Sequence, residues 1–151
     1  RRLEEGVRKN PSDSELEASL GELWLNRLHV PARAEACFDA ALAKWRPAAG
    51  EAAEEAAHLK LRILFYQGYL AKNRGDVKRL RACVREAVAI DPSHVCAVDL
   101  KASLAALEQS QKGVSMKRAL IRRAVWAGVW LLLALGFAGG CIHADIGNMA
   151  R

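Results

Sequence analysis

Nineteen consecutive residues near the end of the chain, Ala124 to Ile142, carry no charged side chain. An α-helix rises about 1.5 Å per residue, so a helix of this length just crosses the roughly 30 Å hydrocarbon core of a bilayer. Apolar or small residues lie all round it, whereas a buried core helix of a small water-soluble domain, the alternative, normally keeps a polar face. The sequence therefore predicts a transmembrane helix over residues 124–144, followed by a short tail over residues 145–151.

The residues on either side of this run predict how the helix crosses the membrane. Four basic residues precede it, whereas the tail offers only Arg151 against Asp145. Because Lys and Arg gather on the side of a membrane that is not translocated, the large N-terminal part is expected on the cytosolic or matrix side. The four basic residues, in a juxtamembrane joint over residues 112–123, are Lys117, Arg118, Arg122 and Arg123.

Two further features of the run suit a membrane helix. Trp126 and Trp130 lie near its basic end, where an indole ring can stay in the interface with its N–H in water. Gly136 and Gly140 have the four-residue spacing of small residues that lets a second helix approach closely. This spacing predicts a helix contact inside the membrane.

The rest of the chain is close to electrical balance. Residues 1–116 carry 18 basic and 16 acidic side chains, so most of the net charge of +6 belongs to the membrane flank. No nucleic-acid partner is expected on this basis. A chain of 151 residues has room for one modest domain beside the membrane segment.

The sequence shows no pattern that carries catalytic chemistry. Its four cysteines and four histidines are scattered, without a Cys-x-x-Cys pair or a metal-binding spacing of histidines. It has no glycine-rich phosphate loop, no His-Glu-x-x-His motif and no nucleophile elbow. We therefore expect no enzyme activity, no metal site and no cofactor.

Residues 13–111, after an N-terminal segment over residues 1–12, are expected to form a helical domain, because their apolar residues recur at helical spacing. Residues that cap or break helices mark the ends of each expected helix. The first helix is expected to start after a cap at Ser12 or Asp13, with a capping box from Ser14 to Glu17, and the second to run from Pro31 to a stop near Pro47. The third is expected to start around Glu51 and to end at a turn over residues 74–76, where Asp76 caps the fourth helix, which stops at Asp91 and Pro92. Ser93 is expected to cap the fifth helix, which a polar joint over residues 109–115 follows.

These helices resemble tetratricopeptide repeats, in which antiparallel helix pairs stack and bury a shared core. In the second pair Gly68, Gly75, Ala87 and Pro92 stand at the repeat's small, turn, small and terminating positions. In the first pair, if the turn holds one extra residue, the matching positions are Leu20, Gly21, Trp24, Ala34, Phe38 and Ala41. The resemblance implies a short solenoid of stacked helix pairs.

The match to the repeat is divergent. Leu80 and Val84 replace the usual alanine and aromatic residue of the second pair, and residues 47–57 are inserted between the pairs. A simple bundle of helical hairpins is the alternative that the pattern leaves open. The predicted fold class is all-α in either case, with antiparallel helix pairs and one C-terminal transmembrane helix.

Two degenerate repeats, a closing helix and a C-terminal anchor resemble the architecture of the tail-anchored mitochondrial fission adaptor family. Plant-type import receptors of the outer membrane, and accessory subunits of some protist and algal respiratory complexes, share this outline. The resemblance implies a non-catalytic, membrane-tethered adaptor or scaffold that binds other proteins at an organellar membrane, mitochondrial by analogy. The alternative is a permanent accessory subunit of a mitochondrial membrane complex such as a respiratory-chain complex.

Two surfaces of the helical domain are expected to contact partners. Repeat stacks receive a peptide on the face lined by the first helix of each pair; the candidates there are Asn26, Tyr66, Tyr69 and Asn73. The second surface is a row of basic residues at steps of four, three and four, which on a helix would form one continuous stripe. Such a stripe would suit an acidic protein or anionic lipids. The alternative is an ordinary solvated helix face. The members of this basic stripe are Arg74, Lys78, Arg81 and Arg85.

Overall fold

The computed structural model describes residues 2–47, 49–50 and 52–146 of the chain, with side chains described as far as Trp130. Within these ranges every regular element is a helix, which confirms the predicted all-α class. The helices are α1 (Arg2–Lys9), α2 (Ser14–Asn26), α3 (Pro31–Lys44), α4 (Ala52–Arg74), α5 (Val77–Ile90) and α6 (Val95–Ile146).

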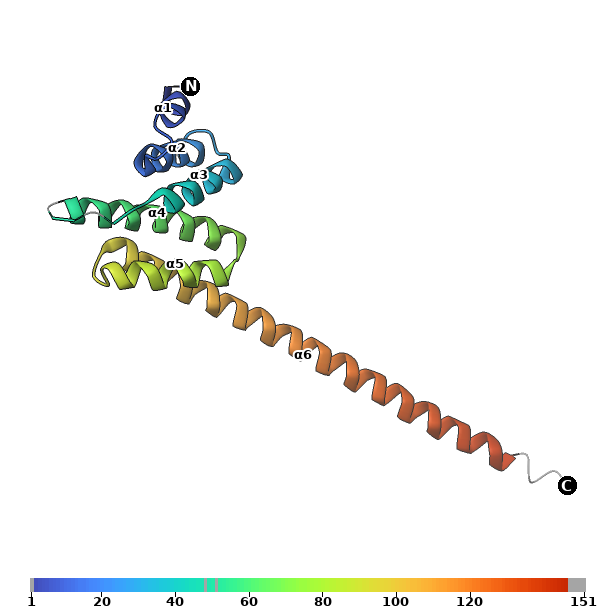
Figure 1. Ribbon diagram of the computed structural model, residues 1–151. Helices are drawn as coiled ribbons and strands as arrows, with labels where there is room; N and C mark the ends of the chain where they lie inside the picture. The colour runs from blue at the N-terminus through green and yellow to red at the C-terminus, as the bar shows by residue number, and fades with distance from the viewer. Residues whose placement is uncertain (1, 48, 51, 147–151) are drawn as a thin grey trace. The chain divides into compact units, whose positions relative to one another are not determined.

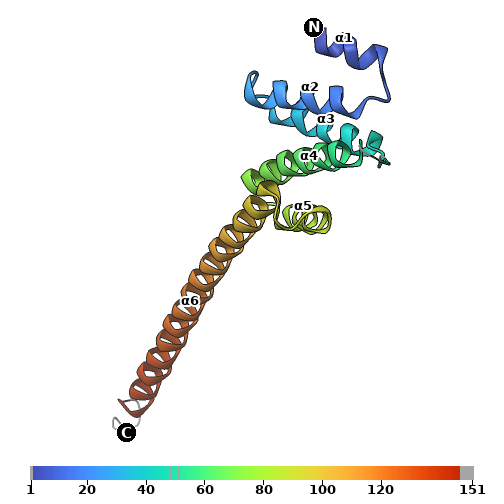
Figure 2. The same ribbon diagram turned by 90° about the vertical axis from the view of Figure 1, so that its left-hand side faces the viewer.

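The chain divides into two units, Arg1–Glu108 and Gln109–Arg151. In the first unit α2 and α3 form one antiparallel pair, and α4 and α5 form a second (Figures 1 and 2). The two pairs meet where α3 packs on α4. Ala97 and Leu100, from the start of α6, are buried against the second pair and close its core.

Local interactions of a few residues fix most helix ends. The side chain of Asp13 accepts hydrogen bonds from the N–H groups of Glu15 and Leu16, and α3 begins at Pro31, as expected. Between α4 and α5 the backbone of Gly75 has a φ of +72°, a conformation that glycine adopts without steric cost. Asp76 then accepts a hydrogen bond from the N–H of Arg79, which confirms its predicted capping role.

Two predicted caps are wrong. Glu17 does not complete a capping box with Ser14, because Asp13 caps α2 and the Glu17 carboxylate pairs with Lys44 of α3. Ser93 does not cap α6 either. Its N–H and hydroxyl both donate to the Asp91 carboxylate, at 2.8 and 2.6 Å, and α6 begins two residues after Ser93.

Residues 109–115, predicted as a polar joint, are helical and belong to α6, and the boundary between the two units falls at their start. Their glutamines and lysine are good helix formers, and the segment contains no proline. A polar composition alone therefore did not break the helix. The segment over residues 1–12, for which no structure was expected, contains helix α1.

Helix α4 has a buried side toward each of its neighbours, and so it joins two hydrophobic clusters. Toward α2 and α3 it contributes Ile63 and Leu70, and toward α5 and α6 it contributes Leu61, Leu64 and Ala71. The largest fully buried side chains of the first unit include Phe38, Ile63, Leu64 and Leu80. Burying such side chains is the main source of stability for this unit.

Glycines permit the close approach of α2 to α3 and of α4 to α6. A Cβ added to Gly21 of α2 would lie 2.8 Å from Cε1 of Phe38, and one added to Gly68 of α4 would lie 2.3 Å from a methyl group of Leu100. Phe38 is fully buried and Leu100 nearly so, which leaves little room for either side chain to move. These contacts explain why glycine stands at both positions.

In the second unit helix α6 continues to Ile146. Among the residues whose side chains are described, no helix is long and apolar enough to cross a membrane. The larger part of the predicted span, residues 131–144 with Gly136 and Gly140, lies outside those residues. Before it, apolar side chains from Val114 to Trp130 are exposed along the helix.

We expect Gly21→Ala to lower the free energy of unfolding by about 1–3 kcal/mol, because the new methyl group would displace the buried Phe38 ring. Gly113→Ala is the matched control: it lies in a helix with nothing within 4 Å of the new Cβ, so it should be neutral or slightly stabilising. Urea unfolding followed by far-ultraviolet circular dichroism measures both. Wild-type stability of Gly21→Ala would contradict the close packing of α2 on α3.

Candidate functional site

An open groove of about 510 Å³ lies between the end of α2 and the end of α4. It mixes polar side chains with an aromatic ring, two leucines and a proline. The groove is built from the last turn of α2, the loop to α3 and the last two turns of α4. Its lining residues are Leu25, Asn26, His29, Pro31, Tyr69, Leu70, Asn73 and Arg74.

A tight turn after α2 forms one wall of this groove. The N–H of Val30 donates to the carbonyl of Trp24 at 2.8 Å, so the chain reverses within a few residues before α3 starts at Pro31. His29 has a φ of +53°, which is uncommon for a residue other than glycine. The reversal brings His29 and Pro31 to the groove beside Asn26.

Three of the four predicted partner-binding residues line this one groove, namely Asn26, Tyr69 and Asn73. Within the described part of the chain neither asparagine side chain makes a hydrogen bond, and the Tyr69 side chain is 45% exposed. Two amides and a phenol are therefore available to a ligand in the groove.

The fourth predicted residue, Tyr66, lies outside the groove. Its ring stacks on Phe38 with the centroids 5.1 Å apart and the planes 3° from parallel, and it packs against the first hydrophobic cluster. Phe65 meets Tyr66 edge-on at 5.7 Å. The structure thus places Tyr66 in the packing between α3 and α4.

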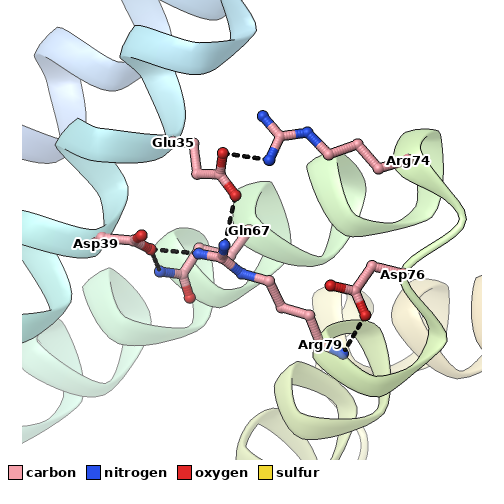
Figure 3. Close-up of polar contacts among 6 residues, drawn as sticks. All are labelled: Glu35, Asp39, Gln67, Arg74, Asp76 and Arg79. Atoms are coloured by element: carbon pink, nitrogen blue, oxygen red, sulfur yellow. Dashed lines mark hydrogen bonds and ion pairs between the residues drawn. The ribbon is translucent and has the colours of Figure 1, made fainter.

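A network of charged side chains lies next to the groove and joins α3 to α4 and α5 (Figure 3). The Glu35 carboxylate of α3 accepts from both Arg74 and Arg79, and Asp39, one turn later, pairs with Arg79. Asp39 also accepts from the buried side chain of Gln67, at 2.7 Å. Arg74 therefore belongs to this network and to the wall of the groove.

The predicted basic stripe does not follow a single helix. Arg74 ends α4, whereas Lys78, Arg81 and Arg85 lie on α5. Arg74 is paired with Glu35, and Arg81 is paired with Glu108 at 2.6 Å. Within the described ranges Lys78 and Arg85 are exposed and make no ion pair, so two of the four basic groups are free to meet a partner.

A second and more acidic groove, of about 870 Å³, lies between the first turns of α2 and α4. Glu15, Glu54, Glu55 and His58 are among its lining residues. Arg62 borders it and forms an ion pair with Glu22 of α2 at 3.1 Å. No local pattern in the sequence marks these residues as neighbours, because the approach of α2 to α4 is a long-range contact.

The cysteine thiols of the first unit are poor nucleophiles. Burial raises the pKa of Cys83 to about 11, and the nearby Arg79 only partly offsets this effect. Burial also raises the pKa values of Cys37 and Cys96. A thiol with a raised pKa stays protonated at neutral pH, and protonated thiols bind metals and attack carbonyls weakly.

No three His, Cys, Asp or Glu side chains of the described residues come together in a way that could hold a metal ion. The predicted membrane flank lies on α6 in the second unit, and its four basic side chains are exposed. These residues are Lys117, Arg118, Arg122 and Arg123.

Comparison of the chain with family models, curated proteins and solved structures gave no match. The groove between α2 and α4 is therefore interpreted from its own geometry. It offers amide, phenol and imidazole groups over an apolar floor of Leu25 and Leu70, a composition that favours non-covalent binding.

We expect Arg79→Ala to lower the free energy of unfolding by about 1–2 kcal/mol, because Glu35 and Asp39 would lose a shared, half-buried partner. Arg85→Ala removes the same type of side chain from the same helix, but one that makes no ion pair within the described residues; it should change stability by less than about 0.5 kcal/mol. Chemical unfolding of the two variants measures the difference. If both unfold at the same denaturant concentration, the network does not stabilise the junction of the helix pairs.

Proposed function

We propose that this chain is a non-catalytic adaptor, which binds a segment of another protein in the groove between α2 and α4. The observation that carries the proposal is the meeting of Asn26, Tyr69 and Asn73 in one groove. The two asparagines come from separate helices, 47 residues apart in the sequence. No local structural requirement brings them together, and their side chains make no other hydrogen bond within the described part of the chain.

The chemistry of the groove suits a peptide. An asparagine amide offers one acceptor and two donor hydrogens, which match the N–H and C=O groups of an extended backbone. Tyr69 offers a large face for an apolar side chain, with the buried Leu70 beneath the same groove. An amide on each wall, with the Tyr69 ring one turn before Asn73 on α4, would hold a strand-like or helical segment through its backbone and one side chain.

The arrangement of the helices supports a repeat-like interpretation of this domain. Two antiparallel pairs, α2 with α3 and α4 with α5, are followed by the start of α6, and glycines stand at the closest approaches. In a tetratricopeptide-like stack the first helix of each pair lines the binding face. That face would here be formed by α2 and α4, the two helices that border the groove.

We propose further that the C-terminal segment holds this domain at a membrane, facing the cytosol or the matrix of an organelle. The support is the uncharged run over residues 124–142 and the basic residues before it. Exposed apolar side chains, including both Trp126 and Trp130, begin before the end of the described residues. By its architecture the proposed location is a mitochondrial membrane.

Tyr69→Ala and Asn73→Ala should each weaken peptide binding by about ten-fold or more, because each removes a group that faces the groove. The probes are peptides selected against the wild-type chain from a random display library, and the readout is a fluorescence anisotropy titration. Lys101→Ala, on an exposed part of α6 that lines neither groove, is the matched control and should bind as the wild type does.

Two outcomes would contradict the proposed binding site. If selection returns no peptide that binds above background, the groove is not a peptide site. If the selected peptides bind Tyr69→Ala and Asn73→Ala with wild-type affinity, their site lies elsewhere on the surface.

The proposed tether predicts that the full chain stays with membranes in alkaline carbonate, whereas a chain that ends at Arg123 is released. A variant with residues 124–142 replaced by a leucine-rich run of the same length is the control and should remain bound, because length and apolarity are the properties required. Sedimentation after extraction measures all three. Release of the full chain by carbonate would refute the tether without affecting the peptide groove.

A further inference from the structure

The second unit contains a short, strongly basic segment whose charge has no counterpart nearby. Lys117, Arg118, Arg122 and Arg123 lie within seven residues, and their side chains are exposed. None of them makes an ion pair within the described residues, and the sequence has no acidic residue between Glu108 and Asp145. We call these four residues the basic collar.

The members of the collar point to different sides of the helix. Successive residues of an α-helix are turned by about 100°, so the four lie at about 0°, 100°, 140° and 240° around its axis. Lys78, Arg81 and Arg85 of α5, in contrast, follow one another at steps of three and four and share one face. A protein or a nucleic acid that docks from one side could reach the α5 face, but would leave part of the collar in water.

The helix changes character along its axis directly after the collar. Val125, Trp126, Val129 and Trp130 are 59%, 63%, 41% and 68% exposed and cover an arc of about 140° around the helix, whereas the other sides of these turns carry only Ala124, Ala127 and Gly128. Basic residues on different sides of the helix are thus followed, from one turn to the next, by turns without any charge, which carry large apolar side chains on one part of their circumference and alanine or glycine on the rest. A helix that enters a bilayer meets the headgroups first and the hydrocarbon next, and each surrounds the helix on all sides.

We infer that the basic collar binds the phosphate groups of anionic lipids in the leaflet that faces the helical domain. This inference rests on the proposed tether, which brings residues 117–123 to the headgroup level. Three of the four residues are arginines, whose guanidinium groups pair with phosphate through two parallel hydrogen bonds. Each basic residue near an anionic surface raises the binding constant roughly five-fold at low salt. Here no neighbouring carboxylate competes for the basic groups.

The test uses the full chain reconstituted in phosphatidylcholine vesicles that contain a minor fraction of an acyl-brominated lipid, either phosphatidylcholine or phosphatidylglycerol. Bromine quenches the fluorescence of Trp126 and Trp130 when the lipid lies beside the helix. Trp24 and Trp45 of the first unit also fluoresce and supply a constant background. This background is measured with vesicles that contain no brominated lipid. We expect a preference of about five-fold for the brominated anionic lipid, decreasing as salt is raised.

Two variants that lose the same amount of positive charge show whether the lipid preference comes from the collar or from the rest of the chain. Lys117→Gln, Arg118→Gln, Arg122→Gln and Arg123→Gln together should reduce the preference to about one, while quenching by brominated phosphatidylcholine persists. The matched control changes four exposed residues of the first unit that make no ion pair within the described ranges, and it should keep the full preference. Its substitutions are Arg27→Gln, Lys78→Gln, Arg85→Gln and Lys101→Gln.

The possible failures are distinguishable. Equal quenching of the wild type by the two brominated lipids would overturn the collar inference and leave the tether intact. A loss of preference in the control variant would also overturn it, because the selectivity would then come from the domain. An absence of quenching by either lipid would refute the tether itself.

Discussion

The packing of Phe38 positions three helices of the first unit. Its ring lies against Gly21 of α2 and stacks on Tyr66 of α4, and it is fully buried. A side chain at residue 21 would push the ring away, and a smaller residue at 38 would leave a cavity. Asn26 lies beyond Gly21 along α2, and Tyr69 lies one turn beyond Tyr66 along α4. The separation that Phe38 sets between these helices therefore sets the width of the groove as well.

Ion pairs beside the groove fix the second helix pair against the first. Arg79 of α5 reaches both Glu35 and Asp39 of α3, across 44 and 40 residues of sequence. No local pattern predicts these ion pairs, because the partners lie on different helices far apart in the sequence. The groove was more accessible to prediction: the resemblance to tetratricopeptide repeats suggested Asn26, Tyr69 and Asn73 as candidates, and the structure places these three in one groove.

Local chemistry decided which parts of the fold could be predicted. Pro31, Gly75 and Asp76 act on their immediate neighbours, and the helix ends that they mark are where the sequence placed them. The differences arose where a local signal had a competitor or was too weak to end a helix. Asp91 takes the hydroxyl of Ser93 away from α6, and the polar residues 109–115 join a helix because nothing in them breaks one. Long-range packing, such as that of Tyr66 on Phe38, has no local signal.

If the chain is the adaptor proposed above, the surface of its first unit suits partners that exchange. Permanent interfaces bury large, continuous apolar areas. Among the described residues of this unit the exposed large hydrophobic side chains are scattered, and they are Leu28, Tyr69, Val95 and Val98. An open groove with two amides and one aromatic ring can supply only part of the affinity that an assembly would need. If the chain and its partner share a membrane, the groove acts at an effective concentration of about a millimolar, so micromolar affinity is sufficient for high occupancy and still permits release.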